Sequence, residues 1–357
     1  MPLSYRKRSL LILNSMNKNL LLFIFFIGIS SLLCSVKFKP NDEIHLFSIP
    51  ENWPIPVYDF NKMPLDSKII DLGRHLFYDP ILSLDNSVSC SSCHLSFTAF
   101  THVDHALSHG IGDRIGTRNS PVLINLAWNK HFMWDGAINH LEVQAIAPIT
   151  HPSEMGEDLL NVLAKLKQSK KYPSKFFHAF GDSTISSKQL LLALTQFQLT
   201  LVSANSKYDK VKRKEEIFTK QEKSGYKLFQ KHCASCHTEP LLTSGEFENN
   251  GLPIDNTLND LGRGKITQNP SDNYTFKVPT LRNIEFSFPY MHDGRFKSLN
   301  EVIEHYSSGI SHTPNLSSKL KNGINLTSNQ KVDIIAFLLT LTDKEFLFNP
   351  DYQFTRD

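Results

Sequence analysis

The chain contains the stretch Cys90-Ser-Ser-Cys-His94 and, in its second half, the related stretch Cys233-Ala-Ser-Cys-His237. In a Cys-x-x-Cys-His motif the two thiols form thioethers with a haem, and the histidine gives its imidazole to the iron. Zinc sites and redox dithiols also use Cys-x-x-Cys pairs, but neither needs a histidine directly after the pair. Two copies therefore predict two covalently bound haem c groups. The predicted attachment and ligand residues are Cys90, Cys93, His94, Cys233, Cys236 and His237.

The sequence around the two motifs is repeated. A Gly-x-x-Leu-Phe segment precedes each motif, and a Pro-x-Leu-x-Asn segment followed by Met-x-Asp-Gly comes after it. These segments begin at Gly73, Pro121 and Met133 in the first half and at Gly225, Pro279 and Met291 in the second half. The spacing within the second block is the same in both halves, which indicates duplicated domains, each built around one haem.

Where the sequence is periodic, its pattern is helical. Apolar residues recur on one helical face over residues 69–77 and 190–201. Thr219 with Glu222 forms a capping-box pattern, and Thr327 is placed to cap a last helix. We therefore predict a mainly α fold with two cytochrome c-like helical domains related by internal duplication, each around one covalently bound c-type haem.

The expected domain limits follow from the repeat. We predict an N-terminal haem domain at residues 45–208 and a C-terminal haem domain at residues 209–357. The linker is expected in the charged run from Lys207 to Lys220.

The N-terminal residues predict export. Basic residues at 6–8 precede an apolar run from Leu20 to Leu33, which is typical of a secretory signal. This run is shorter than the roughly 20 residues that a membrane-spanning helix needs. We expect residues 1–34 to be a signal peptide and the protein to be periplasmic. Two alternatives stay open, an uncleaved anchor and a lipid on Cys34, and each would tether the chain to a membrane.

The composition excludes some functions. With 38 basic and 35 acidic side chains in 357 residues, the net charge of +3 gives no nucleic-acid footprint. Four of the five cysteines are used by the haem motifs, which leaves no disulfide framework.

At this point the order of motifs resembles the bacterial diheme cytochrome c peroxidases and their tryptophylquinone-forming relative MauG. The resemblance covers about residues 50 to 345. Besides the haem motifs, it rests on Arg118-Asn-Ser-Pro121, Trp134-Asp-Gly136, Gln144-Ala145, Pro148, Glu154-Met155, Pro279-Thr-Leu-Arg-Asn283 and Pro289-Tyr-Met-His-Asp-Gly294.

The resemblance implies a division of labour between the two haems. The His94 haem is expected to react with peroxide, and the His237 haem is expected to accept electrons from a donor protein. Glu154 matches a distal acid that moves protons, and Gln144 matches a neighbouring position that can hydrogen-bond peroxide. Trp134 matches the aromatic relay between the haems. Without the resemblance, Glu154 reads as a surface carboxylate, and a core tryptophan that only packs is an alternative for Trp134.

The sixth iron ligands decide between catalysis and simple electron transfer. For the first haem, the resemblance implies a loop histidine that gates access, and His109 is the best match, with His102 and His105 as competitors. For the second haem, the register places Tyr306 where the peroxidases carry methionine and where MauG carries tyrosine. Met291 is the alternative ligand, since methionine is a usual ligand of c-type haems.

The family also carries a calcium ion between the haems. The matching positions are Asn119, with its side-chain oxygen, and the backbone carbonyls of Ser287 and Pro289. Such neutral oxygen ligands suit a hard cation in a water-rich site.

We therefore predict a diheme peroxidase that reduces hydrogen peroxide to water with electrons from a small exported cytochrome c or cupredoxin. One alternative is a MauG-like oxidase that acts on a partner protein, which Tyr306 favours. A second is a non-catalytic diheme electron-transfer cytochrome with two six-coordinate irons. The sequence leaves a homodimer open.

Overall fold

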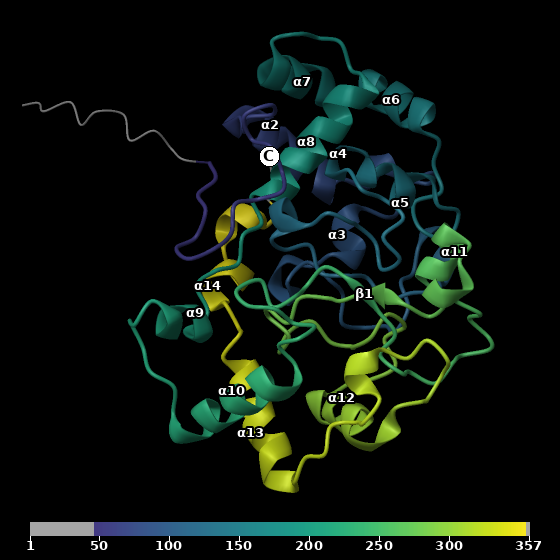
Figure 1. Ribbon diagram of the computed structural model, residues 1–357. Coiled ribbons are helices and arrows are strands. Elements are labelled where there is room, and N and C mark those ends of the chain that lie inside the picture. Colours follow the sequence, from purple (N-terminus) through teal and green to yellow (C-terminus); the bar gives the residue numbers. More distant parts are fainter. Residues whose placement is uncertain (1–45, 355–357) are drawn as a thin grey trace, which may run out of the picture. The chain divides into compact units, whose positions relative to one another are not determined.

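The computed structural model describes residues 46–354 (Figure 1). The expected signal peptide and Cys34 lie outside these residues. Within them, no helix is both long enough and apolar enough to cross a membrane.

The elements are mainly short helices joined by long loops, as the sequence predicts. The α-helices are α2 (Ser67–Tyr78), α3 (Cys90–Cys93), α4 (Leu141–Gln144), α5 (Ile146–Thr150), α6 (Leu159–Gln168), α7 (Tyr172–Phe180), α8 (Ser187–Leu199), α9 (Lys207–Lys212), α10 (Lys220–His232), α11 (Arg263–Thr267), α12 (Leu299–Glu304), α13 (Ser328–Leu339) and α14 (Lys344–Leu347). Short helices of other types are η1 (Pro80–Leu82), η2 (Ser96–Thr98), η3 (Ile111–Asp113), η4 (Leu126–Trp128), η5 (Pro270–Asp272), the π-helix η6 (His305–Gly309), η7 (Ser318–Leu320) and η8 (Pro350–Tyr352). Strands β1 (Phe247–Glu248) and β2 (Phe276–Lys277) form one antiparallel pair.

The first half is organised around the contact between α2 and α8. Asp66 caps α2 by accepting hydrogen bonds from two backbone N–H groups of its first turn. The predicted apolar face of α2 is buried. Where α2 meets α8, a Cβ atom on Gly73 would lie 1.9 Å from the carbonyl oxygen of Ala193, so only glycine permits this approach.

The second half repeats this contact with α10 and α13, which lie side by side in Figure 1. A Cβ atom on Gly225 would lie 1.9 Å from the carbonyl oxygen of Asp333. The predicted caps are confirmed, because Thr219 and Glu222 form a capping box before α10 and Thr327 forms one with Gln330 before α13. The duplication seen in the sequence is therefore present in the helix packing.

Each half has its own apolar core. The first core contains α2, α8 and the loops between them, and the second contains Phe229, Phe337 and their neighbours. Phe346 and Leu347 of α14 pack in the first core, so the end of the chain returns to the N-terminal half. The domain limits 45–208 and 209–357 stay a prediction, but they do not account for the packing of Phe346 and Leu347 in the first core.

The expected linker is partly helical. Residues Lys207–Lys212 form α9, and Tyr208 and Asp209 of this helix are buried. The sequence did not predict this helix, because the residue that holds it, Arg282, lies far away in the sequence.

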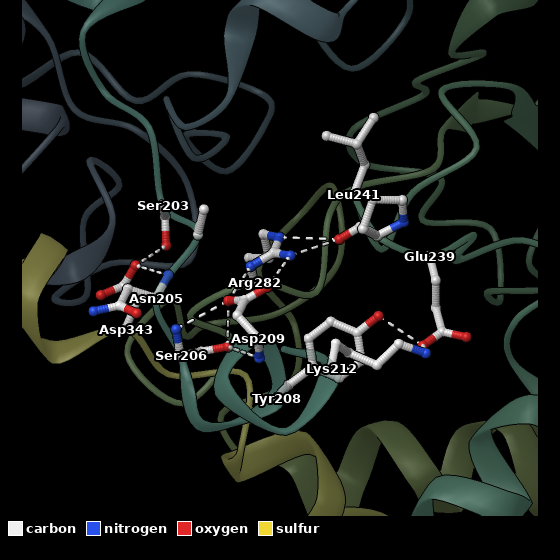
Figure 2. Close-up of polar contacts among 12 residues, drawn as sticks. Ser203, Asn205, Ser206, Tyr208, Asp209, Lys212, Glu239, Leu241, Arg282 and Asp343 are labelled. Atoms are coloured by element: carbon white, nitrogen blue, oxygen red, sulfur yellow. Dashed lines mark hydrogen bonds and ion pairs between the residues drawn. The ribbon is translucent and has the colours of Figure 1, made fainter. Parts of the chain in front are cut away.

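Arg282 is fully buried and forms a bidentate ion pair with Asp209 (Figure 2), with both N···O distances at 2.8 Å. It also donates hydrogen bonds to the carbonyl oxygen of Pro240, and its guanidinium lies over the ring of Trp53. Burial raises the pKa of Asp209, but the hydrogen bonds from Arg282 and Ser206 outweigh it and hold this pKa below its ordinary value. The pair fixes α9 to the loop that follows β2.

The variant Arg282→Met should lower the free energy of unfolding by about 3–5 kcal/mol, because it leaves the Asp209 carboxylate buried without its partner. Guanidinium denaturation followed by circular dichroism measures this change. The control Lys62→Met removes a cation from an ion pair with exposed Asp59 and should leave the midpoint almost unchanged. Equal midpoints for the two variants would contradict a structural role for the buried pair.

Candidate active site

The first haem motif lies on a single short helix. Ser89 and Ser92 form a capping box around α3, and the N–H of His94 donates to the carbonyl oxygen of Cys90. The Nδ1 atom of His94 lies 2.6 Å from the carbonyl oxygen of Phe100. Burial lowers the pKa of His94 to about 4, so the imidazole is neutral, as an iron ligand must be. A donating Nδ1–H fixes the tautomer that leaves Nε2 free to bind a metal.

The second motif starts where α10 ends. The Nδ1 atom of His237 lies 3.2 Å from the carbonyl oxygen of Leu242 and 3.1 Å from that of Pro279. Burial lowers the pKa of His237 to about 4 as well. The cysteines of both motifs are free thiols, and burial raises the pKa of Cys90 and of Cys233 to about 12.

One cavity of about 620 Å³ connects the two motifs. Its lining includes His94 and His237 together with Cys93, Cys233 and Cys236. Free thiols, neutral imidazoles with a fixed tautomer and a continuous cavity fit two covalently attached haem groups. His94 and His237 would hold the irons, and the haems would supply the redox chemistry of the site.

The predicted distal residues lie in the same cavity. Both Gln144 and Glu154 line it, as does His94. Burial raises the pKa of Glu154, although nearby His151 opposes this shift. The turn that carries Glu154 packs against Gly110, where a Cβ atom would lie 2.5 Å from the Cα of Glu154. Gln144 directs its Nε2 towards Met133, 3.7 Å from the sulfur atom.

Trp134 lines the cavity and ties the two halves together. Its Nε1–H donates to the carbonyl oxygen of Asn119 at 2.8 Å, and its own carbonyl oxygen accepts from the N–H of Lys277 at 2.7 Å. Next to it, Arg118 forms ion pairs with Asp135 and with Asp260 from the second half. The indole is therefore held by Asn119 of the first half, while the backbone of Trp134 is bonded to Lys277 of the second half.

The structure does not bring the His109 side chain into this cavity. Its Nδ1 lies 2.8 Å from a carboxylate oxygen of exposed Asp113, and its ring stacks on His105 with centroids 4.1 Å apart. Only the backbone comes close to the first motif, because the carbonyl oxygen of His109 accepts from Cys93 at 3.5 Å. His102 is buried, and neither of its ring nitrogens has a partner in the described chain. A gating role for His109 stays a prediction.

Tyr306 and Met291 both line the cavity near the second motif. The side chain of Asn250 lies between them, since its amide donates to the sulfur of Met291 at 3.4 Å and also contacts the Tyr306 hydroxyl. Burial raises the pKa of Tyr306 to about 12. Tyr306 lies in the π-helix η6, a type of turn that is frequent at functional sites. Both residues line the cavity, so the choice of ligand stays a prediction.

The predicted calcium ligands also meet at the cavity. Asn119, Ser287 and Pro289 all line it, although they come from different halves of the chain. The amide nitrogen of Asn119 donates to the carbonyl oxygen of Ala106 at 3.0 Å, which leaves its side-chain oxygen as an acceptor.

Many cavity residues were not singled out as site residues from the sequence, and three of them are Met133, His131 and Lys277. Met133 faces Gln144, and its counterpart Met291 in the repeat was the only signal for it. His131 and Lys277 also line the cavity, but isolated basic residues in loops carry no recognisable pattern.

Comparison with known proteins agrees with this geometry. A family model described as di-haem cytochrome c peroxidase matches residues 67–217, and a cytochrome c model matches residues 222–342. The chain is 36% identical to the methylamine utilization protein MauG of Methylorubrum extorquens over 83% of each chain. It is 31% identical to the cytochrome c551 peroxidase of Nitrosomonas europaea over 81% of this chain and 83% of that protein.

A solved structure of a MauG-like protein associated with microbial copper homeostasis superposes with a TM-score of 0.78. It is 31% identical and covers 86% of this chain and 98% of its own. The chain belongs to the family of diheme cytochrome c peroxidases and MauG, and it is an oxidoreductase that carries two covalently bound haem c groups.

Replacing both Cys233 and Cys236 by alanine should reduce the covalent haem content from two groups per chain to one, because the second thioether pair is lost. Pyridine haemochrome absorbance and haem staining of denaturing gels measure this content. The control Ser235→Ala, within the same motif, should keep both haems. Retention of two covalent haems in the double variant would contradict the assignment.

Proposed function

We propose that the protein reduces hydrogen peroxide to water at the His94 haem, with two electrons from a small exported cytochrome c or cupredoxin. The observation that carries this proposal is that Glu154 and Gln144 share one cavity with His94, while Trp134 extends from the same cavity to the second half. The overall reaction consumes one peroxide, two electrons and two protons and releases two waters.

Glu154 is suited to move the protons of this reaction. Cleaving the O–O bond requires a group that takes a proton from one peroxide oxygen and returns it to the oxygen that leaves as water. A carboxylate whose pKa is raised by burial gives up and takes back protons nearer to neutral pH than an exposed one. The amide of Gln144, which lines the same cavity, is a donor for orienting the bound peroxide.

The repeat offers a reason why the first haem would be the reactive one. Leu141 corresponds to Leu299, and counting from these residues places Pro148 at the position of Tyr306. Both residues line the cavity. Proline has no side-chain atom that binds iron, so the first half lacks a ligand where the second half has a phenol.

Electrons would enter at the second haem, held by His237, and pass Trp134 on their way to the first. The indole N–H donates to Asn119, and the backbone carbonyl of Trp134 accepts from Lys277 of the second half. A large polarisable ring shortens the gap that electrons must cross.

Export, a cleaved or lipidated signal and a calcium ion at Asn119, Ser287 and Pro289 belong to the same proposal. A homodimer stays open within it. The predicted signal would place the protein in the periplasm, where small electron carriers are available. A calcium ion would add charge near Trp134, because Asn119 accepts the indole N–H through its backbone carbonyl.

A MauG-like oxidase of a partner protein is the second candidate, and buried Tyr306 in the cavity favours it. An anionic phenolate ligand stabilises ferric iron and lowers the potential of the haem. The non-catalytic electron carrier would instead require six-coordinate low-spin iron at both haems. An EPR spectrum of the oxidised and half-reduced protein, followed by stopped-flow addition of peroxide, separates these functions.

The variant Glu154→Gln should lower kcat for peroxide reduction by about 10²–10⁴-fold, because the amide cannot carry the proton. The measurement is steady-state oxidation of a reduced cytochrome donor. In the wild type, activity should fall as the pH drops through a pKa above the ordinary 4.5, since the carboxylate must be ionised to accept the proton. The control Glu142→Gln changes a carboxylate outside the cavity and should keep full activity. A fully active Glu154→Gln enzyme would exclude this role.

The variant Tyr306→Phe should change the EPR signal of one haem and raise its reduction potential, because the phenolate ligand is lost. Met291→Leu serves as the matched variant and should leave that signal unchanged. The reverse pattern would identify Met291 as the ligand and weaken the case for the MauG-like oxidase.

A further inference from the structure

Lys277 is a cation that lines the cavity without an anionic partner. It lies on β2, and its backbone N–H is fixed to the carbonyl oxygen of Trp134 at 2.7 Å. Its side chain is half-buried because it borders the cavity, and desolvation alone lowers its pKa to about 8. Within residues 46–354, no hydrogen bond or ion pair of its ammonium group offsets this desolvation.

The carboxylates that line the cavity either form ion pairs with other cations or have no effect on the pKa of Lys277. Asp135 and Asp260 are both paired with Arg118, at 2.7 and 2.6 Å. Glu248 is paired with Lys319 at 2.7 Å. Glu154 shows no electrostatic effect on the pKa of Lys277. A buried ammonium without a counter-ion is costly, so its position in the fold calls for an anion from outside the polypeptide.

His131 is a second cavity residue with an unbonded nitrogen, although the charge of Glu246 acts on its pKa. Its Nδ1 atom is buried without a hydrogen-bond partner. Its ring contacts Phe247, the residue that is paired with Lys277 across the β1–β2 ladder. Lys277 contributes to the electrostatic environment that lowers the pKa of His131. Two donors, one from each half of the chain, thus lie close together at the same wall of the cavity.

We propose that Lys277, with His131 beside it, binds a carboxylate of a haem propionate next to Trp134. This inference rests on the two haem c groups of the proposed holoprotein, and it does not depend on peroxide turnover. A haem would bring propionate carboxylates into the cavity, where no carboxylate of residues 46–354 pairs with Lys277. Lys277 is a positioning residue, because it acts on the haem charge and orientation and does not touch the substrate.

The decisive experiment is a spectroelectrochemical titration of the holoprotein and three variants. Lys277→Met removes the charge, and Lys277→Arg retains it. Lys130→Met is the matched control, since Lys130 is exposed, lies next to His131 in the sequence and does not line the cavity. Removing a cation beside a haem disfavours reduction. We expect Lys277→Met to shift one haem equilibrium by roughly tenfold towards the oxidised form, which is about 59 mV for one electron.

Lys277→Arg should stay near the wild-type potentials, and Lys130→Met should leave both unchanged. The inference would be overturned if both haem potentials were unshifted in a Lys277→Met protein that carries two haems. It would also be overturned if Lys130→Met produced an equal shift. If Lys277→Met does not load haem, resonance Raman spectroscopy of wild type and Lys277→Arg decides instead. The propionate-bending band must then move while the coordination markers stay constant, and an unmoved band overturns the inference. Absence of haem from the wild type would mean failure of the proposed function itself.

Discussion

The close crossing of two helices at a glycine is the constraint on which each half of the molecule depends. At Gly73 and again at Gly225, a Cβ atom would lie 1.9 Å from a carbonyl oxygen of the partner helix. Such an approach brings α2 onto α8 and α10 onto α13 with their apolar faces interlocked. Because α10 ends at His232, directly before Cys233, its position also sets where the second motif starts. Any side chain at these glycines would force the helices apart and displace the haem motif with them.

A second set of interactions joins the halves where electrons would pass. Arg118 of the first half is held between Asp135 and Asp260, and the N–H of Asn119 donates to the carbonyl oxygen of His292 at 2.7 Å. Trp134 is bonded to both halves through Asn119 and Lys277. The rate of electron tunnelling depends steeply on distance, so a relay side chain must keep its position during fluctuations of the structure. Partly buried ion pairs with satisfied hydrogen bonds provide that rigidity better than apolar contacts alone.

Much of this arrangement was predictable because it is local or repeated. The two haem motifs, the capping boxes at Thr219 and Thr327 and the glycine segments are all contiguous patterns, and the structure has them where the sequence places them. Partnerships between distant residues were not predictable. Nothing near Asp209 in the sequence points to Arg282, so the short helix α9 within the expected linker was not predicted. In the same way, Lys277 reads as one lysine among many until the fold brings it to the cavity.

The duplication explains how one scaffold supports two different haem environments. Corresponding positions keep their backbone shape, as the positive φ angles of Met133 and Met291 and of Gly136 and Gly294 show. The side chains between them have diverged. Trp134 corresponds to His292, whose ring stacks on Phe276.

The same divergence continues along the following helices. Counting from Leu141 and Leu299 pairs Gln144 with Val302. Leu141, Gln144 and Val302 line the cavity. Leu299 is buried in the second core. The first half therefore lines the cavity with an amide where the repeat has an apolar side chain in the second half. The first half has a proline at the position of Tyr306, so it offers no ligating side chain there, whereas the second half places a phenol in the cavity. Under the proposed function, peroxide would react in the first environment and electrons would enter at the second, because Glu154 of the first half can exchange protons with a bound peroxide.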